Sequence, residues 1–251
     1  MKLGYKTAGH GEHYVIALHG WFGDHSCFDP MLDSLSLGEF TYAFPAYRGY
    51  GLSKHLSGDY SMREISADII ELANSLGWSK FSLIGHSMGG KATQRLLIDA
   101  PVRIRRIVAI TPSPACTVPF DPQGMTLFEG AARNLDNRRV IIDFSTGNRL
   151  SKSWIDRIAR YSAETSNVEA FAGYFRAWQK TDFSAELKGW EVPLLVIPGE
   201  HDLAITPEDM QATYLAWNPA AEMYVMPNAG HYPMNETPVA LATAIEAFLR
   251  K

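Results

Sequence analysis

Short apolar runs alternate with stretches of helical periodicity along most of the chain. The apolar runs predict strands at residues 3–7, 14–18, 40–44, 81–84, 107–110, 194–197 and 222–225, the first two joined by a turn at 9–12. Strands that alternate with helices are typical of a mostly parallel sheet covered by helices. We therefore expect an α/β fold.

Polar residues with capping side chains mark where several helices begin. Residues 61–64 (SMRE) have the capping-box pattern and predict a helix through about Ser75. Asp29, Thr206 and Thr237 each precede a proline, which suits the first helical position. Further helices are therefore predicted to begin at these three points.

The alternation stops between about Cys116 and Phe183, where helical patterns occur without a convincing pair of strands. One apolar stripe with helical spacing is formed by Val168, Phe171, Phe175 and Trp178. Regular alternation resumes at 192–194. We expect a core domain of residues 1–116 and 184–251, and a helical cap of residues 117–183. The cap is expected to follow the sixth strand and to cover the carboxyl edge of the sheet as a lid.

One serine stands between glycines in the sequence GHSMGG at residues 85–90. A predicted strand leads into this motif, and a helix-compatible run at 91–99 leads out of it. A sharp turn from strand to helix strains the backbone at the serine, and flanking glycines let the chain pass without Cβ clashes. Ser87 is therefore a candidate nucleophile, although a tight turn with a structural serine shows the same pattern.

A serine hydroxyl becomes nucleophilic when a histidine accepts its proton, and a carboxylate fixes the tautomer of that histidine. Asp202 follows the predicted strand 194–197, and His231 follows the last predicted strand. The order Ser87, Asp202, His231 is the one expected for hydrolases with a nucleophile elbow. These residues form a candidate catalytic triad.

A second loop, at residues 19–23 (HGWFG), ends the predicted strand 14–18. We expect the backbone N–H groups of Trp21 and Met88 to form an oxyanion hole, in which removing one such donor costs about 2.7–4 kcal/mol. His19 is expected to hold this loop by hydrogen bonds and not to act as a base.

With these landmarks in this order, the chain resembles the α/β-hydrolase fold superfamily, in its lid-bearing, serine esterase-like branch. The resemblance runs from the His-Gly pair at 19–20 to the Gly-His pair at 230–231. It implies an acyl-enzyme on Ser87, proton transfer by His231 and no cofactor. Some members carry the acid after the sixth strand, and Asp121 is the nearest alternative of that kind.

The residue types at the motifs distinguish this chain from several branches of the superfamily. A serine at the elbow differs from the aspartate of haloalkane dehalogenases and epoxide hydrolases. His86 and the Trp21-Phe22 pair differ from the asparagine and the glycine-rich front loop of relatives that cleave carbon–carbon bonds. At residues 45–51 (PAYRGYG) the chain lacks an aspartate that many members carry, which leaves the role of Arg48 open.

We expect a serine hydrolase that cleaves a carboxylic ester or lactone with an apolar portion. Two alternatives stay open: a carbon–carbon, thioester or amide hydrolase with the same triad, and a low-turnover ligand-sensing protein of the same fold. The Gly89-Gly90 pair favours an enzyme. The expected pocket residues adjoin the catalytic atoms or lie in the cap: Phe22, Trp154, Phe171, Tyr174, Trp178 and Tyr232.

Composition excludes several other classes of protein. The 251 residues are 46% hydrophobic and 20% charged, which is typical of a globular protein. A net charge of −4 without a basic block argues against nucleic acid as the partner. Cys27 and Cys116 have neither zinc nor redox spacing, so no metal is expected. The N-terminus shows no signal-peptide pattern, and we expect a cytoplasmic protein with a small-molecule substrate and no membrane partner. The oligomeric state stays open.

Overall fold

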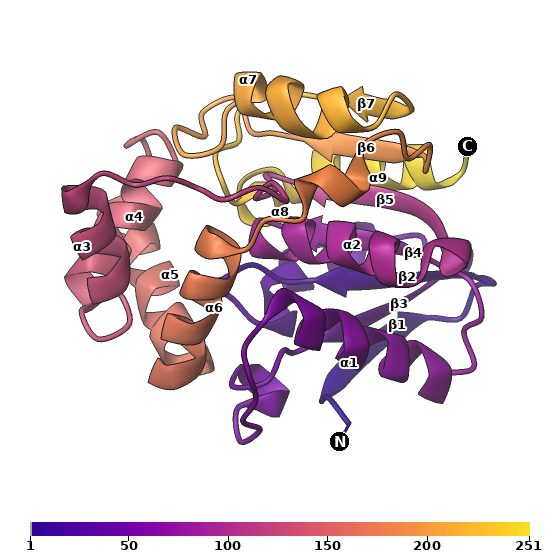
Figure 1. The fold of residues 1–251 in the computed structure, drawn as a ribbon, viewed down its shortest axis with the longest axis horizontal. Coiled ribbons are helices and arrows are strands. Elements are labelled where there is room, and N and C mark those ends of the chain that lie inside the picture. The colour runs from indigo at the N-terminus through magenta and orange to yellow at the C-terminus, as the bar shows by residue number, and fades with distance from the viewer. Residues whose placement is uncertain (1) are drawn as a thin grey trace.

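The computed structural model describes residues 2–251, which form a seven-stranded sheet flanked by helices (Figure 1). The strand order is β1-β3-β2-β4-β5-β6-β7, and only β1 runs antiparallel to its neighbour. The predicted, mostly parallel sheet is thus confirmed. The strands are β1 (Tyr5–Gly9), β2 (His13–Leu18), β3 (Phe40–Pro45), β4 (Phe81–His86), β5 (Ile104–Ile110), β6 (Leu194–Ile197) and β7 (Ala221–Met223).

Each strand forms within a few residues of its predicted position. β6 matches the prediction residue for residue, whereas β5 begins earlier, directly after a short 3₁₀ turn. The turn at 9–12 joins β1 to β2 along the chain, but β1 pairs with β3, with Tyr5 opposite Pro45. All six residues of the central strand β4 are buried, and its carboxyl end leads directly to Ser87.

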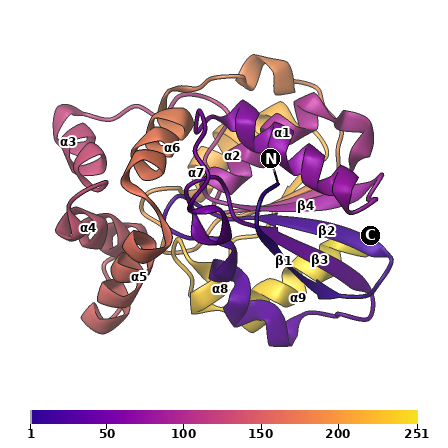
Figure 2. The same cartoon turned by 90° about the horizontal axis from the view of Figure 1, so that it is seen from below.

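Helices cover both faces of the sheet (Figure 2). α1 (Met62–Ser75) and α2 (Met88–Asp99) lie on one face, and η1 (His25–Ser34) packs with α9 (Pro238–Leu249) on the other. The shorter segments are η2 (Gly51–Ser53), η3 (Pro101–Arg103), η4 (Ser184–Leu187), α7 (Pro207–Met210), η5 (Gln211–Leu215) and α8 (Pro233–Glu236).

The predicted helix starts are correct at three of the four positions. Ser61 Oγ accepts from Glu64 N at the start of α1, and Thr206 forms a capping box at the start of α7. α9 begins after Thr237, as expected, although this side chain makes no capping hydrogen bond. The prediction at Asp29 is wrong, because Asp24 caps η1 and the helix continues through the following proline.

Four α-helices lie between β5 and β6: α3 (Pro122–Gly130), α4 (Leu135–Ser145), α5 (Lys152–Thr165) and α6 (Val168–Lys180). We call them the cap helices. They gather at one end of the sheet in both views (Figures 1 and 2). They follow the fifth strand and not the sixth, because the chain forms one strand fewer ahead of them than the resemblance implied. The bounds 117–183 for a separate cap stay a prediction.

None of the helices in residues 2–251 has the length and apolar character that crossing a membrane would require.

Candidate active site

Ser87 occupies a strained turn between β4 and α2. Its φ of 53° and ψ of −117° lie outside the common regions for a side-chain-bearing residue, which costs on the order of 1–3 kcal/mol. Three main-chain hydrogen bonds hold the turn: Ser87 N donates to Ile110 O at 2.9 Å, and Ser87 O accepts from Gly90 N at 2.8 Å and Ser113 N at 3.0 Å. The surrounding backbone therefore imposes this conformation.

The two glycines that flank the serine are required by close packing. A Cβ atom at Gly85 would lie 2.5 Å from the carbonyl oxygen of Gly89. A Cβ atom at Gly89 would lie 2.3 Å from the carbonyl oxygen of Leu18. The expectation that these positions must lack a side chain is confirmed.

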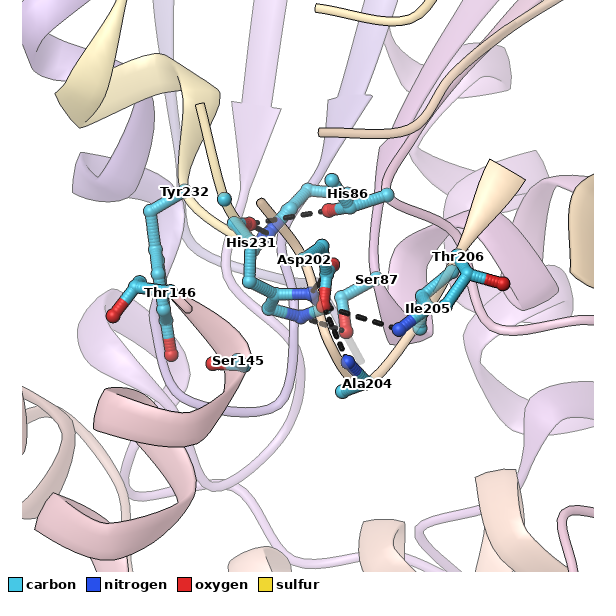
Figure 3. Close-up of polar contacts among 12 residues, drawn as sticks. His86, Ser87, Ser145, Thr146, Asp202, Ala204, Ile205, Thr206, His231 and Tyr232 are labelled. Atoms are coloured by element: carbon cyan, nitrogen blue, oxygen red, sulfur yellow. Dashed lines mark hydrogen bonds and ion pairs between the residues drawn. The ribbon is translucent and has the colours of Figure 1, made fainter. Parts of the chain in front are cut away.

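Three side chains from different loops meet beside this turn (Figure 3). His231 Nε2 lies 3.0 Å from Ser87 Oγ, and His231 Nδ1 lies 2.6 Å from Asp202 Oδ2. The second carboxylate oxygen, Asp202 Oδ1, accepts from Ala204 N at 2.9 Å and Ile205 N at 3.0 Å. The Asp202 side chain is fully buried, so these donors replace water around its charge.

Two further histidines near the site are buried and neutral. His86 Nε2 donates to the carbonyl oxygen of His231 at 2.8 Å, and burial together with nearby His231 lowers the pKa of His86 to about 3. His19 Nδ1 donates to Gly20 O at 2.8 Å, and its Nε2 accepts from Tyr47 N at 3.1 Å. Burial lowers the pKa of His19 to about 4. His19 therefore holds the front loop, as predicted.

The alternative acid lies in a different environment. Asp121 caps α3, where its carboxylate accepts from Gly124 N at 2.6 Å. Asp202 is the carboxylate that contacts the His231 ring.

The two expected oxyanion donors lie where two elements end, Met88 at the start of α2 and Trp21 in the loop after β2. Met88 is the first residue of α2, so its N–H has no partner within the helix. Trp21 follows β2, where its indole donates to Phe171 O at 2.7 Å and its carbonyl accepts from Tyr50 Oη at 2.9 Å. These two bonds fix the loop that carries the Trp21 amide.

A cavity of about 420 Å³ opens over the serine and the histidine. Of the residues expected in the pocket, Phe22, Trp178 and Tyr232 line its wall. Other apolar side chains, from the cap helices, α7 and the neighbouring loops, also line it: Val118, Phe120, Phe128, Ile141, Phe144, Leu203, Ile205 and Met210.

Known proteins show the same architecture. The family model for the alpha/beta hydrolase fold matches residues 14–238. The chain belongs to the α/β-hydrolase fold family.

The relatives of this α/β-hydrolase include enzymes with different substrates. It is 27% identical over 256 residues to the pimeloyl-[acyl-carrier protein] methyl ester esterase of Nitrosomonas europaea, covering 96% of this chain and 97% of that protein. It is 23% identical over 246 residues to a 2-hydroxy-6-oxononadienedioate/2-hydroxy-6-oxononatrienedioate hydrolase of Dechloromonas aromatica, covering 92% and 85%. These relatives support a hydrolase.

A solved structure agrees in fold. A bromoperoxidase from Bacillus anthracis superposes with a TM-score of 0.87 at 21% identity, covering 98% of this chain and 95% of that one. At this identity the likeness supports the fold alone.

Three of the residues that the sequence placed in the pocket do not line the cavity: Trp154, Phe171 and Tyr174. The Phe171 ring packs 3.7 Å below the guanidinium of Arg138. Tyr174 packs against Tyr50, with ring centroids 5.6 Å apart, and Trp154 meets the ring of Tyr232 at 5.6 Å. The pocket prediction was wrong at these three positions, because an aromatic residue in a cap helix can be buried against neighbouring side chains without facing the cavity.

The contribution of α4 to the cavity was not predicted from the sequence. Ile141 and Phe144, one helical turn apart on α4, both face it. Their i, i+3 spacing was the available signal, but it is equally typical of a helix that packs on its neighbours.

Charge is sparse around the cavity. In the described range 2–251, no lysine or arginine lines the wall, and Asp209 is the only carboxylate that does. The same residues contain no group of three or more His, Cys, Asp or Glu side chains that could hold a metal ion.

Proposed function

We propose that the chain is a serine hydrolase that cleaves an uncharged carboxylic ester or lactone through an acyl-enzyme on Ser87. The observation that carries the proposal is the continuous hydrogen-bonded path from Ser87 Oγ through His231 to Asp202, at the floor of an apolar cavity. A nucleophile, a base and an orienting carboxylate in this arrangement are the parts that acyl transfer requires.

The chemistry follows from the positions of these atoms. His231 Nε2 takes the proton of Ser87 Oγ as the oxygen attacks the carbonyl carbon of the ester. The tetrahedral intermediate collapses, the carbon–oxygen bond to the alcohol breaks, and His231 returns the proton to the leaving alcohol. Water, deprotonated by His231, then attacks the acyl-enzyme and releases the carboxylic acid and Ser87. Asp202 keeps the proton on Nδ1, so that Nε2 is free to accept.

The negative charge of the tetrahedral intermediate needs donors near Ser87. We assign this role to the N–H groups of Met88 and Trp21, the first at the amino end of α2 and the second in a loop fixed by two hydrogen bonds. Donors that are already oriented stabilise the charge without reorganisation during the reaction.

The wall of the cavity supports an ester over the dioate substrate of the Dechloromonas relative. A dioate carries two carboxylates, and charged groups removed from water need a partner of opposite charge. The wall offers no lysine or arginine within residues 2–251, and its single carboxylate, Asp209, would repel an anion. An apolar acyl or alcohol group fits this lining, and residues 117–183 act as the cap over it.

A fluorophosphonate probe tests the nucleophile. The intact protein should be labelled at Ser87, Ser87→Ala should show no labelling, and His231→Ala should be labelled far more slowly. Ser113→Ala is the matched control, because Ser113 lines the same cavity and should leave labelling unchanged. A folded protein that resists labelling at Ser87 would overturn the proposal.

A substrate panel distinguishes the remaining alternatives. Chromogenic esters of graded acyl length should be turned over many times per protein molecule, ahead of thioesters, amides and carbon–carbon substrates. Ser87→Ala supplies the background rate. A single burst of one product per protein would favour a ligand-sensing role, and a preference for a non-ester bond would replace the ester assignment.

A further inference from the structure

The carboxylate of Glu236, in α8, binds the backbone on both sides of His231. Glu236 Oε2 accepts from Gly230 N at 2.8 Å, and Oε1 accepts from Tyr232 N at 3.0 Å. Only 3% of the Glu236 side chain is exposed. One buried carboxylate therefore fixes the Ala229–Gly230 and His231–Tyr232 peptide groups, which lie before and after the candidate base.

The remaining main-chain groups of His231 are also bound. Its N–H donates to the carbonyl oxygen of Ser145, at the carboxyl end of cap helix α4, at 3.0 Å. Its carbonyl oxygen accepts from His86 Nε2 at 2.8 Å and from Thr111 Oγ1 at 3.1 Å. The backbone around His231 is thus held jointly by Glu236 of α8, by His86 at the end of β4 and by cap helix α4.

A cation from the segment between α4 and α5 completes this arrangement. Arg149 pairs with Glu236 Oε2 and also donates to Asn228 O at 3.1 Å. It is the cation that neutralises the buried carboxylate, and a buried charge that loses its partner is strongly destabilised. The Gly230 backbone lies so close to α4 that an added Cβ would be 2.7 Å from the Cα of Thr146.

We infer that Glu236 and Arg149 are positioning residues, through which the cap helices hold His231 in register for proton transfer. The inference rests on the proposed function. Asp202 is held separately, by Ala204 N and Ile205 N, so a shift of residues 230–232 moves the imidazole relative to both of its partners. A misplacement of about 1 Å can reduce a rate on the order of 10²-fold.

Variants at both ends of the ion pair test this role. Arg149→Met and Glu236→Gln should each lower kcat for a short-chain ester by about 10- to 10²-fold, with KM changed by less than about twofold. Arg149→Lys should restore most of kcat, because it returns the charge. The double variant should lose little more than either single variant, since both act through one contact.

A matched control distinguishes the positioning of His231 from a general effect of contacts between the cap helices and α8. Arg157, on cap helix α5, donates to Asn235 Oδ1 of the same helix α8 at 3.1 Å, without contacting the His231 backbone. Arg157→Met should leave kcat unchanged. A direct reading comes from the downfield proton resonance of the His231 Nδ1–H···Asp202 hydrogen bond, which should shift or broaden in Arg149→Met and stay unchanged in Arg157→Met.

The outcomes separate this inference from the proposed function. If the intact protein is labelled and active, and folded Arg149→Met retains its kcat and its downfield resonance, the inference is overturned. A loss confined to KM, or an equal loss in Arg157→Met, also overturns it. If the intact protein is not labelled at Ser87, the proposed function itself fails. Because the Arg149 side chain is partly exposed, its variant keeps the test valid even where Glu236→Gln does not fold.

Discussion

The buried carboxylate of Asp202 meets three donors at once: the imidazole of His231 and the amides of Ala204 and Ile205. The amides leave the position of the carboxylate fixed whether or not the histidine is present. Its contact with Nδ1 then selects the tautomer in which Nε2 faces Ser87 as an acceptor. At this scale, the chemistry depends on which ring nitrogen carries the proton.

Asp202→Asn should therefore reverse the tautomer while keeping the shape of the site. The amide group would donate to Nδ1, place the proton on Nε2 and prevent it from accepting from Ser87. We expect kcat to fall by about 10⁴-fold, the loss seen for the same change in another Ser-His-Asp enzyme, with a small change in KM. Steady-state kinetics on one ester measures it. Asp121→Asn is the control, and a comparable loss there would assign the acid to Asp121.

The reacting residues could be predicted from the sequence, because each follows a recognisable strand in the order that the chemistry requires. Ser87 also stands between two glycines that close packing demands. Glu236 could not be predicted, since a glutamate in the short helix after His231 gives no sign that it folds back onto residues 230 and 232. The prediction of Phe171 as a pocket residue was wrong because helical periodicity indicates that a side chain is buried but not what it contacts. In the structure, the Phe171 ring packs against Arg138.

At the scale of elements, α4 contributes both to the cavity wall and to the position of His231. Ile141 and Phe144 face the cavity, and the Ser145 carbonyl at the carboxyl end accepts from His231 N. The strand positions could be predicted from apolar runs, because the central strands of a sheet covered by helices bury their side chains. The start of η1 could not be predicted, because Asp24 caps this helix instead of Asp29. Asp24 also accepts a hydrogen bond from Tyr161 of α5, a residue distant in the sequence.

Phe144→Ser should alter substrate preference without unfolding the helix. The side chain lines the cavity and is 48% exposed, so its loss removes apolar contact from the distal part of a substrate. We expect KM for a long-acyl ester to rise about tenfold, the lower end of what small changes in a hydrophobic pocket produce, and KM for an acetate ester to stay the same.

Val140→Ser is the matched control for this change. Val140 is 52% exposed on the same helix and does not line the cavity. Its variant should retain the KM of the intact protein for both esters. Equal effects of the two substitutions, or an equal rise in KM for acetate, would show that α4 does not contact the acyl chain.

At the scale of the whole molecule, the parallel sheet brings the loops after β2, β4, β5 and β6 to one edge, where they surround Ser87. Because these loops converge, they bury polar side chains that hold the backbone by hydrogen bonds, among them His19 and His86. Both are neutral in the fold, since burial lowers their pKa values to about 4 and about 3. The arrangement of the site thus makes the fold sensitive to acid.

The sign of this sensitivity follows from proton binding. Below the ordinary histidine pKa of about 6.5, the unfolded chain binds protons at these positions and the folded chain does not, so stability falls as pH falls. For His86 the free energy of unfolding should drop by about 2 kcal/mol between pH 7 and pH 5. The phenylalanine in His86→Phe cannot titrate. The free energy of unfolding of this variant, measured with urea, should therefore change by about 2 kcal/mol less between pH 7 and pH 5 than that of the intact protein. His55→Asn, at an exposed histidine, is the matched control. If His86→Phe keeps the full pH dependence of the intact protein, the acid sensitivity arises elsewhere, and His86 is not held neutral by burial.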